Sequence, residues 1–176
     1  ALKDGMMFSL PFLMIGSLFL LIANLPIKSL NTLVAKCGLA DICSQVYSST
    51  FSLMALFTVV GITYSYLKND KISTAVNGAL TGLAAFVLLT PSSKVLENGE
   101  AVTGVISKDW TAGQGMICAI LIGFLVGYIY SLCIRKDIRV KMPEGVPPGV
   151  ADSFSSLLPT GIITIVCAII YAVCHF

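Results

Sequence analysis

Charged residues are scarce in this sequence. Its 176 residues include 11 Lys and Arg and 9 Asp and Glu, together 11 %, whereas an ordinary soluble domain has about a quarter. Hydrophobic residues make up 56 %, and the mean hydropathy is +0.91. A water-soluble fold of this length has too small an interior to bury that much apolar surface. The net charge of +2 also lacks the basic excess of nucleic-acid-binding proteins. The composition therefore excludes a soluble enzyme, a secreted disulfide scaffold and a nucleic-acid-binding module.

Residue patterns that carry catalysis or bind metals are also missing. His175 is the sole histidine, and the six cysteines form no C-x-x-C pair. The sequence has no recognisable Ser-His-Asp set, paired-carboxylate site or glycine-rich phosphate loop. Long apolar stretches have no Asp, Glu, Lys or Arg at their centres, where ion pumps and proton-coupled carriers keep them. The polar residues Asn24, Asn77 and Gln114 are expected to hydrogen-bond between helices. We therefore predict no catalytic, substrate-binding or metal-binding residue and no cofactor.

Five long stretches contain no charged residue at all. They are 5–27, 42–67, 72–93, 110–134 and 153–176. A helix that crosses the roughly 30 Å hydrocarbon core of a bilayer needs about 20 apolar residues, and each stretch is long enough. The sequence therefore predicts an all-α, polytopic membrane protein with about five transmembrane helices, which has the lipid bilayer as its first partner.

The Lys and Arg residues divide unequally between the two ends of these spans. With the N-terminus inside, the cytoplasmic set is Lys3, Lys68, Lys71, Arg135, Lys136, Arg139 and Lys141, and the outer set is Lys28, Lys36, Lys94 and Lys108. Cytoplasmic connections carry the excess of basic residues in membrane proteins. The distribution therefore predicts a cytoplasmic N-terminus and, after five spans, a C-terminus on the outside.

The outer segment after the first span has its own pattern. Apolar residues recur there at helical spacing: Ile27, Leu30, Val34 and Cys37. This spacing favours a short amphipathic helix along the membrane interface, although an ordered loop explains it equally well. The sequence leaves open whether Cys37 and Cys43 form a disulfide, because both cysteines are expected on the outside. The second outer connection, about 94–109, is expected to be hairpin-like or irregular.

Small residues form a stripe along the fourth predicted span. The small-residue stripe consists of Gly115, Ala119, Gly123, Gly127 and Ser131, each four residues from the next. Gly78 and Gly82 make a shorter version in the third span. Small residues allow helix backbones to approach closely in a bilayer, where apolar side chains gain little by leaving lipid. Both sets predict close helix packing, either within one chain or between the two copies of a dimer.

Two prolines lie inside predicted spans, Pro11 in the first and Pro159 in the fifth. Each removes one backbone hydrogen bond, so each helix is expected to bend there. Such bends mark moving parts in some transporters, but a kink fixed by packing is the simpler explanation.

The segment from Lys141 to Phe154 is the most specific string in the chain. Its three prolines are expected to exclude a helix over 143–148 and to stiffen an extended path. Asp152 or Ser153 is expected to cap the last span. The cytoplasmic motif consists of Met142, Pro143, Glu144, Gly145, Val146, Pro147 and Pro148. A rigid segment of this kind suits docking to another surface, and a stiff connector is the plainer alternative.

The same string carries a family resemblance. The segment from Lys141 to Pro159 resembles a pattern typical of enzyme IIC, K-M-P-E-G-V-P-P-x-V-x-x-S-F-x-x-L-x-P. Enzyme IIC is the membrane component of the bacterial phosphoenolpyruvate-dependent sugar phosphotransferase system, here of the lactose, cellobiose and chitobiose branch. The opening is similar as well, with Asp4-Gly5, Pro11 and the run 15–26. Two separated matches in the right order extend the resemblance over essentially the whole chain.

The resemblance implies properties that the residues alone do not. Members of the family are longer carriers of the bacterial cell membrane that work as homodimers. Their N-terminal half, about five spans, builds the dimer scaffold, and their C-terminal half holds the disaccharide. A phosphocysteine on a separate cytoplasmic component, enzyme IIB, phosphorylates the sugar. None of the cysteines in this chain corresponds to that residue.

We therefore expect residues 1–176 to form a single N-terminal scaffold and dimerisation domain, with the sugar-binding C-terminal domain absent. The parent would take up and phosphorylate β-linked disaccharides, contact enzyme IIB, and bind sugar only with the missing half. The alternative is a complete, small ligand-capturing membrane protein of a vitamin-type transporter. That alternative needs a convergent pocket, for which the aromatic candidates are Trp110, Tyr64, Tyr66, Tyr128 and Tyr130. An aromatic belt at the membrane interface explains these residues better.

Overall fold

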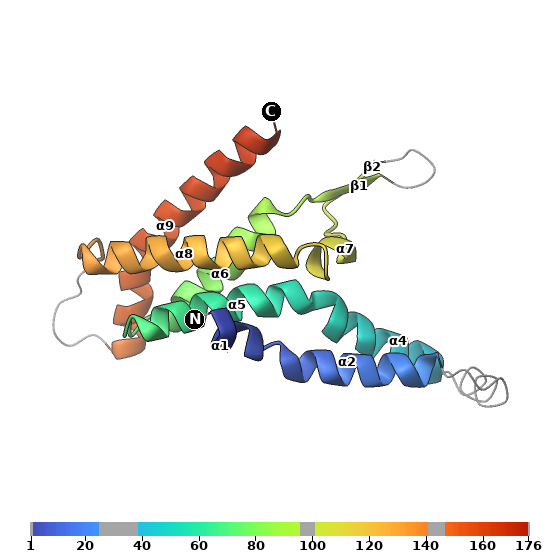
Figure 1. Ribbon diagram of the computed structural model, residues 1–176. Helices are drawn as coiled ribbons and strands as arrows, with labels where there is room; N and C mark the ends of the chain where they lie inside the picture. Colours follow the sequence, from blue (N-terminus) through green and yellow to red (C-terminus); the bar gives the residue numbers. More distant parts are fainter. Residues whose placement is uncertain (1, 25–38, 96–100, 141–146, 176) are drawn as a thin grey trace.

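The computed structural model describes residues 2–24, 39–95, 101–140 and 147–175. These residues are almost entirely helical (Figure 1). The helices are α1 (Leu2–Met7), α2 (Leu10–Ala23), α4 (Leu39–Thr50), the short 3-10 turn η1 (Phe51–Leu53), α5 (Met54–Asn69), α6 (Ala75–Leu89), α7 (Lys108–Thr111), α8 (Met116–Arg135) and α9 (Pro148–His175). Two short strands, β1 (Ser93–Val95) and β2 (Ala101–Thr103), pair antiparallel between α6 and α7.

The predicted fold class is confirmed. Among the described residues, four helical segments are long and apolar enough to cross a membrane, and α6 is a shorter apolar helix. The four are Leu2–Ala23, Leu39–Asn69, Met116–Arg135 and Gly149–Cys174. Helix α6 has 15 residues, or about 22 Å at 1.5 Å per residue, against the 22-residue stretch expected from the charges. It ends because Thr90 precedes Pro91 and takes the extended conformation that proline imposes on its neighbour.

Helix α5 lies at the centre of the bundle, in contact with α1, α6 and α8 (Figure 1). Helix α6 also contacts α8 and α9. The core between these helices is mainly apolar, with bulky buried side chains from α5, α6, α8 and α9 and a few buried threonines such as Thr58 and Thr63. Its largest fully buried side chains include Val59, Ile62 and Leu67 of α5, Phe86 of α6, Val126 and Tyr130 of α8, and Ile163 of α9.

Helices α2 and α4 pack side by side and extend away from this bundle (Figure 1). The first span is interrupted at Phe8 and Ser9, and Pro11 follows in the first turn of α2. A proline in the first turn costs no hydrogen bond, because the amide there has no helical partner. The expected bend at Pro11 is therefore a break just before it. Pro159 lies inside α9, where a bend was expected.

The connections agree with the sequence in part. The hairpin of β1 and β2, with Ser93 opposite Thr103, matches the hairpin-like connection expected near 94–109. The predicted interfacial helix, including Cys37, and the motif residues Met142 to Val146 lie outside the described residues. Cys43 is a buried, free thiol.

The predicted start of the last span is wrong. Helix α9 begins at Pro148, so Asp152 and Ser153 both lie inside the helix instead of capping it. Proline is favoured at the first position of a helix, since its fixed φ suits the helix and its missing N–H is not needed there. The Pro147-Pro148 pair therefore starts the helix that we expected it to block.

Candidate functional site

The small-residue stripe of α8 faces α5 in the same chain. A methyl group added at Gly123 would lie 3.1 Å from Cγ2 of Ile62, and one added at Gly127 would lie 2.9 Å from Cγ of Tyr66. Ala119 and Ser131, in the same stripe, are buried. Gly115 caps α8, and a methyl group there would overlap the carbonyl oxygen of Trp110. At Gly123 and Gly127, α8 thus approaches α5 too closely for larger side chains, whereas Gly115 is close to Trp110 and Phe86.

The shorter pair on α6 also faces α5. A methyl group on Gly82 would lie 2.6 Å from Oγ1 of Thr63, and one on Gly78 would overlap Cδ1 of Leu67. The Thr63 hydroxyl lies between the two glycine surfaces, donating to the carbonyl of Val59 at 2.8 Å and approaching that of Gly123 at 3.3 Å. Helix α5 therefore occupies the space between both sets of small residues, and a contact between copies would have to use other faces.

A third close approach was missed by the sequence analysis. A methyl group on Gly5 would lie 2.5 Å from Cα of Ile62, and one on Gly61 would overlap the carbonyl oxygen of Gly5. Helices α1 and α5 therefore touch backbone to backbone. Each helix contributes one glycine here, so no four-residue repeat exists to reveal the contact from the sequence.

Charged side chains join the ends of α5 and α8. Nη2 of Arg135 lies 3.0 Å from Oδ1 of Asp70, and the Ser131 hydroxyl donates to Oδ2 of the same carboxylate. These groups border an open cavity of about 320 Å³, which is also lined by Tyr66, Tyr128, Leu132 and Lys136. Two residues of the predicted basic end, Arg135 and Lys136, are thus brought together beside the end of α5.

Polar side chains also join α6 and α9. Nδ2 of Asn77 donates to the carbonyl of Asp152 at 3.2 Å and to the hydroxyl of Ser156 at 3.1 Å. One turn further, the hydroxyls of Thr81 and Thr160 lie 2.9 Å apart. Asn77 therefore has the interhelical role that the sequence predicted. The Asn24 amide instead bonds to a carbonyl of its own helix.

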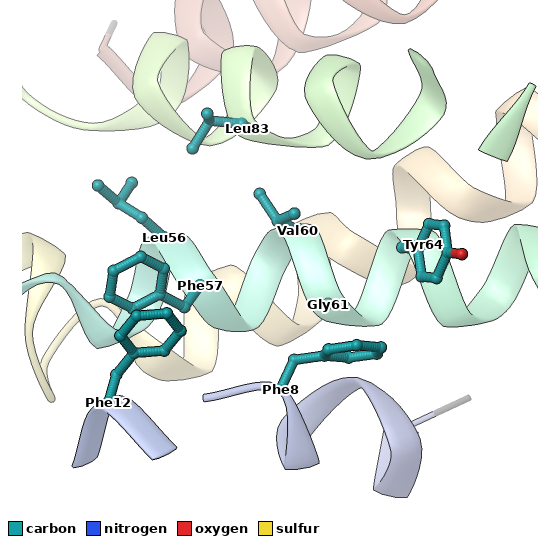
Figure 2. Close-up of a pocket in the computed structure, with 8 residues that line it drawn as sticks. All are labelled: Phe8, Phe12, Leu56, Phe57, Val60, Gly61, Tyr64 and Leu83. Carbon is teal, nitrogen blue, oxygen red and sulfur yellow. The ribbon is translucent and has the colours of Figure 1, made fainter. Parts of the chain in front are cut away.

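An apolar groove runs along the opposite side of α5 from α8 (Figure 2). It has a volume of about 460 Å³. Helix α5 contributes Leu56, Phe57, Val60, Gly61 and Tyr64, the α1–α2 segment contributes Phe8 and Phe12, and α6 contributes Leu83. The Phe12 and Phe57 rings stack with centroids 4.3 Å apart, and Phe8 meets Tyr64 edge-on at 5.9 Å.

The aromatic residues of the ligand-capturing alternative do not converge. Tyr64 lines the apolar groove, Tyr66 and Tyr128 line the cavity between α5 and α8, and Trp110 is exposed in α7. Tyr130 is fully buried and donates to Oγ1 of Thr74 at 3.0 Å. Within the described ranges, no three His, Cys, Asp or Glu residues form a group that could hold a metal ion.

Apolar helices around α5, with charged residues near their ends, define a multi-pass helical membrane protein. The chain belongs to the family described as phosphotransferase system, EIIC, whose sequence profile matches residues 3–174. Within it, the chain falls in the lactose, cellobiose and chitobiose branch. The resemblance carried by the cytoplasmic motif is thereby confirmed, and the protein is a bacterial membrane protein.

Three relatives show how much of a member is present. The chain is 37 % identical over 161 residues to the oligo-β-mannoside-specific EIIC component of Bacillus subtilis, covering 90 % of this chain and 36 % of the relative. It is 35 % identical to the cellobiose-specific EIIC component of Geobacillus stearothermophilus, covering 94 % and 38 %. The crystal structure of ChbC, the IIC component of the N,N'-diacetylchitobiose-specific phosphotransferase system, matches with a TM-score of 0.88 at 33 % identity. That match covers 96 % of this chain and 41 % of ChbC, so the chain spans about two fifths of the length of these relatives.

Proposed function

We propose that this chain is the N-terminal scaffold portion of a permease that takes up and phosphorylates β-linked disaccharides. The names of its relatives, which specify oligo-β-mannoside, cellobiose and N,N'-diacetylchitobiose, support this substrate class. The observation that carries the scaffold role is that the interhelical polar side chains of the described residues serve packing. Asn77 bonds to Asp152 and Ser156, Thr81 pairs with Thr160, and Asp70 pairs with Arg135 and Ser131. A disaccharide is recognised by several convergent polar groups, which supports a sugar site in the rest of the carrier.

Isothermal titration of the purified chain with cellobiose and N,N'-diacetylchitobiose tests this proposal. A scaffold portion gives no binding heat with either sugar, whereas a permease that includes the rest of the carrier binds one of them. Saturable binding by residues 1–176 alone would contradict the scaffold role and would favour the ligand-capturing alternative.

The proposal includes an orientation and a cytoplasmic partner. The contact between Asp70 and Arg135 places basic residues from the ends of α5 and α8 at one end of the bundle, which supports a cytoplasmic position for that end. The phosphoryl donor would be enzyme IIB, which approaches from this side.

Single cysteines in a cysteine-free background test the orientation in intact cells with a membrane-impermeant maleimide. Val105→Cys, beyond the hairpin of β1 and β2, should be labelled, and Lys136→Cys should be labelled only after lysis. Both positions are exposed, so access to the side chain itself is matched. The reverse pattern would invert the orientation.

We also propose that the chain forms a homodimer, as the family resemblance implies. Because α5 covers Gly123 and Gly127 of the small-residue stripe, the contact between copies would use other faces. Light scattering in a mild detergent, with the detergent mass subtracted, should give twice the chain mass of 18.7 kDa. A monomer at every concentration tested would reject dimerisation by this portion and leave the scaffold role to be judged by the titration.

A further inference from the structure

One face of α5 changes character along its length. Phe57, Gly61, Tyr64 and Lys68 follow one another at intervals of three or four residues, so they lie on the same side of the helix. The first three line the apolar groove, and Lys68 comes one turn later, near the end of the helix. In Figure 2 the Tyr64 ring stands at one end of the row of lining side chains.

The groove can accept only an apolar occupant along most of its length. Of the eight residues that line it, Tyr64 alone has a polar side-chain atom. A sugar or another polar solute would find almost no hydrogen-bond partner there. The volume of about 460 Å³ falls within the range of sites that hold organic ligands, about 300–1,000 Å³. In a bilayer the apolar molecules at hand are lipid acyl chains.

The end of the groove at Tyr64 has a positive charge beside it. Nζ of Lys68 lies 5.6 Å from the centroid of the Tyr64 ring, and the Lys68 side chain is exposed. Lysine and tyrosine at the end of a membrane helix lie at the level of the lipid head groups. A cation there attracts the phosphate of an anionic lipid.

We propose that this groove is a specific binding site for an anionic phospholipid. One acyl chain lies along α5 between Phe57 and Tyr64, against Phe8 and Phe12, and the phosphate lies beside the Lys68 ammonium. The charge at one end and the apolar walls beyond it match the two parts of such a lipid. The proposal rests neither on the sugar specificity nor on the dimer proposed above.

Native mass spectrometry of the full chain, released from a mild detergent, tests the charged end. The probes are phosphatidylglycerol and phosphatidylcholine with identical acyl chains. We expect one retained phosphatidylglycerol and a preference of about fivefold over phosphatidylcholine, the effect of one basic residue near the membrane surface. Lys68→Gln should abolish the preference. Lys136→Gln, which removes the same charge from the cavity between α5 and α8, should leave it unchanged.

Filling the groove tests the apolar end. Val60→Trp should remove both lipid adducts, whereas Leu121→Trp, on an exposed position of α8, should keep them. If Val60→Trp fails to fold, Leu83→Phe narrows the groove from α6 and should weaken binding of both lipids.

Three results would overturn the proposal. The first is a lipid preference that survives Lys68→Gln and is lost in Lys136→Gln, which would place the lipid between α5 and α8. The second is retention of both adducts in the groove-filling variants. The third is a dimer that becomes a monomer in Val60→Trp while its lipid adducts stay unchanged, which would assign the groove to a second copy. Lys68→Gln should leave the mass in light scattering unchanged, so failure of the lipid site and failure of the dimer are distinguishable.

Discussion

The backbone contact between α1 and α5 gives the sharpest test of the packing. In Gly61→Ala, the new methyl group overlaps the carbonyl oxygen of Gly5 and comes within 3.3 Å of Cβ of Phe8. Rotation of a side chain cannot relieve a clash with backbone, so α1 has to move away from α5. Overpacking of this kind costs about 1–3 kcal/mol. Alanine also favours a helix over glycine by about 0.5–1 kcal/mol, which offsets part of the cost.

Gly161→Ala is the matched control, because Gly161 lies inside α9 and a methyl group there meets nothing within 4 Å. It gains the helix preference without the clash. The two variants should therefore differ by the overpacking term alone, about 1–3 kcal/mol, with Gly61→Ala the less stable.

The free energy of unfolding is measured by titrating mixed micelles with SDS and following helix content by circular dichroism. Gly5→Ala should behave like Gly61→Ala, and the double variant should lose less than the sum of the two, since both disrupt one contact. A Gly61→Ala protein as stable as Gly161→Ala would refute the backbone contact between α1 and α5.

Three further substitutions probe other contacts by the same titration. Gly123→Leu combined with Gly127→Leu forces α8 away from α5 and should lower the free energy of unfolding by about 2 kcal/mol or more. Asp70→Asn removes the ion pair with Arg135, whose side chain is 67 % exposed, so the loss should stay at or below about 1 kcal/mol. Asn77→Ala removes two hydrogen bonds between α6 and α9 and should cost about 0.6–1.7 kcal/mol.

Each of these predictions has a control in the chain. Asp137→Asn breaks the ion pair with Arg139, which joins residues two apart outside the helices, and should leave stability unchanged. Asn24→Ala removes a bond within a single helix end and should cost less than Asn77→Ala. An Asn77→Ala protein equal to Asn24→Ala would show that α6 and α9 are held by apolar packing. An undiminished stability in the double leucine variant would contradict the close approach of α8 to α5.

The membrane spans were predictable because placing a charge in hydrocarbon is costly, so charge-free stretches reveal helices directly. Their ends were less predictable. Helix α6 is shortened by the local effect of Pro91, and α9 begins at Pro148 because proline both blocks and initiates helices. A proline at the first position of a helix initiates it, and a proline further inside disrupts it. From the sequence alone, a proline pair does not show which of the two prolines is the first helical residue.

The packing surfaces were predictable only where one helix carries the whole signal. The small-residue stripe has four members on α8 and a fifth, Gly115, at its N-cap, so its spacing shows a close approach but not the partner helix. The contact of Gly5 with Gly61 is shared between two helices that lie far apart in sequence. The apolar groove combines residues from three segments. In the sequence, each of these residues alone is typical of a side chain that faces the membrane.

The charged residues of the described spans lie near the span ends, and this position has an electrical consequence. Moving one elementary charge through a potential of 100 mV changes its free energy by about 2.3 kcal/mol. Because these helices have no charge at mid-span, they move almost no charge across the membrane field when they shift against one another. We therefore expect the membrane potential to exert little force on this packing.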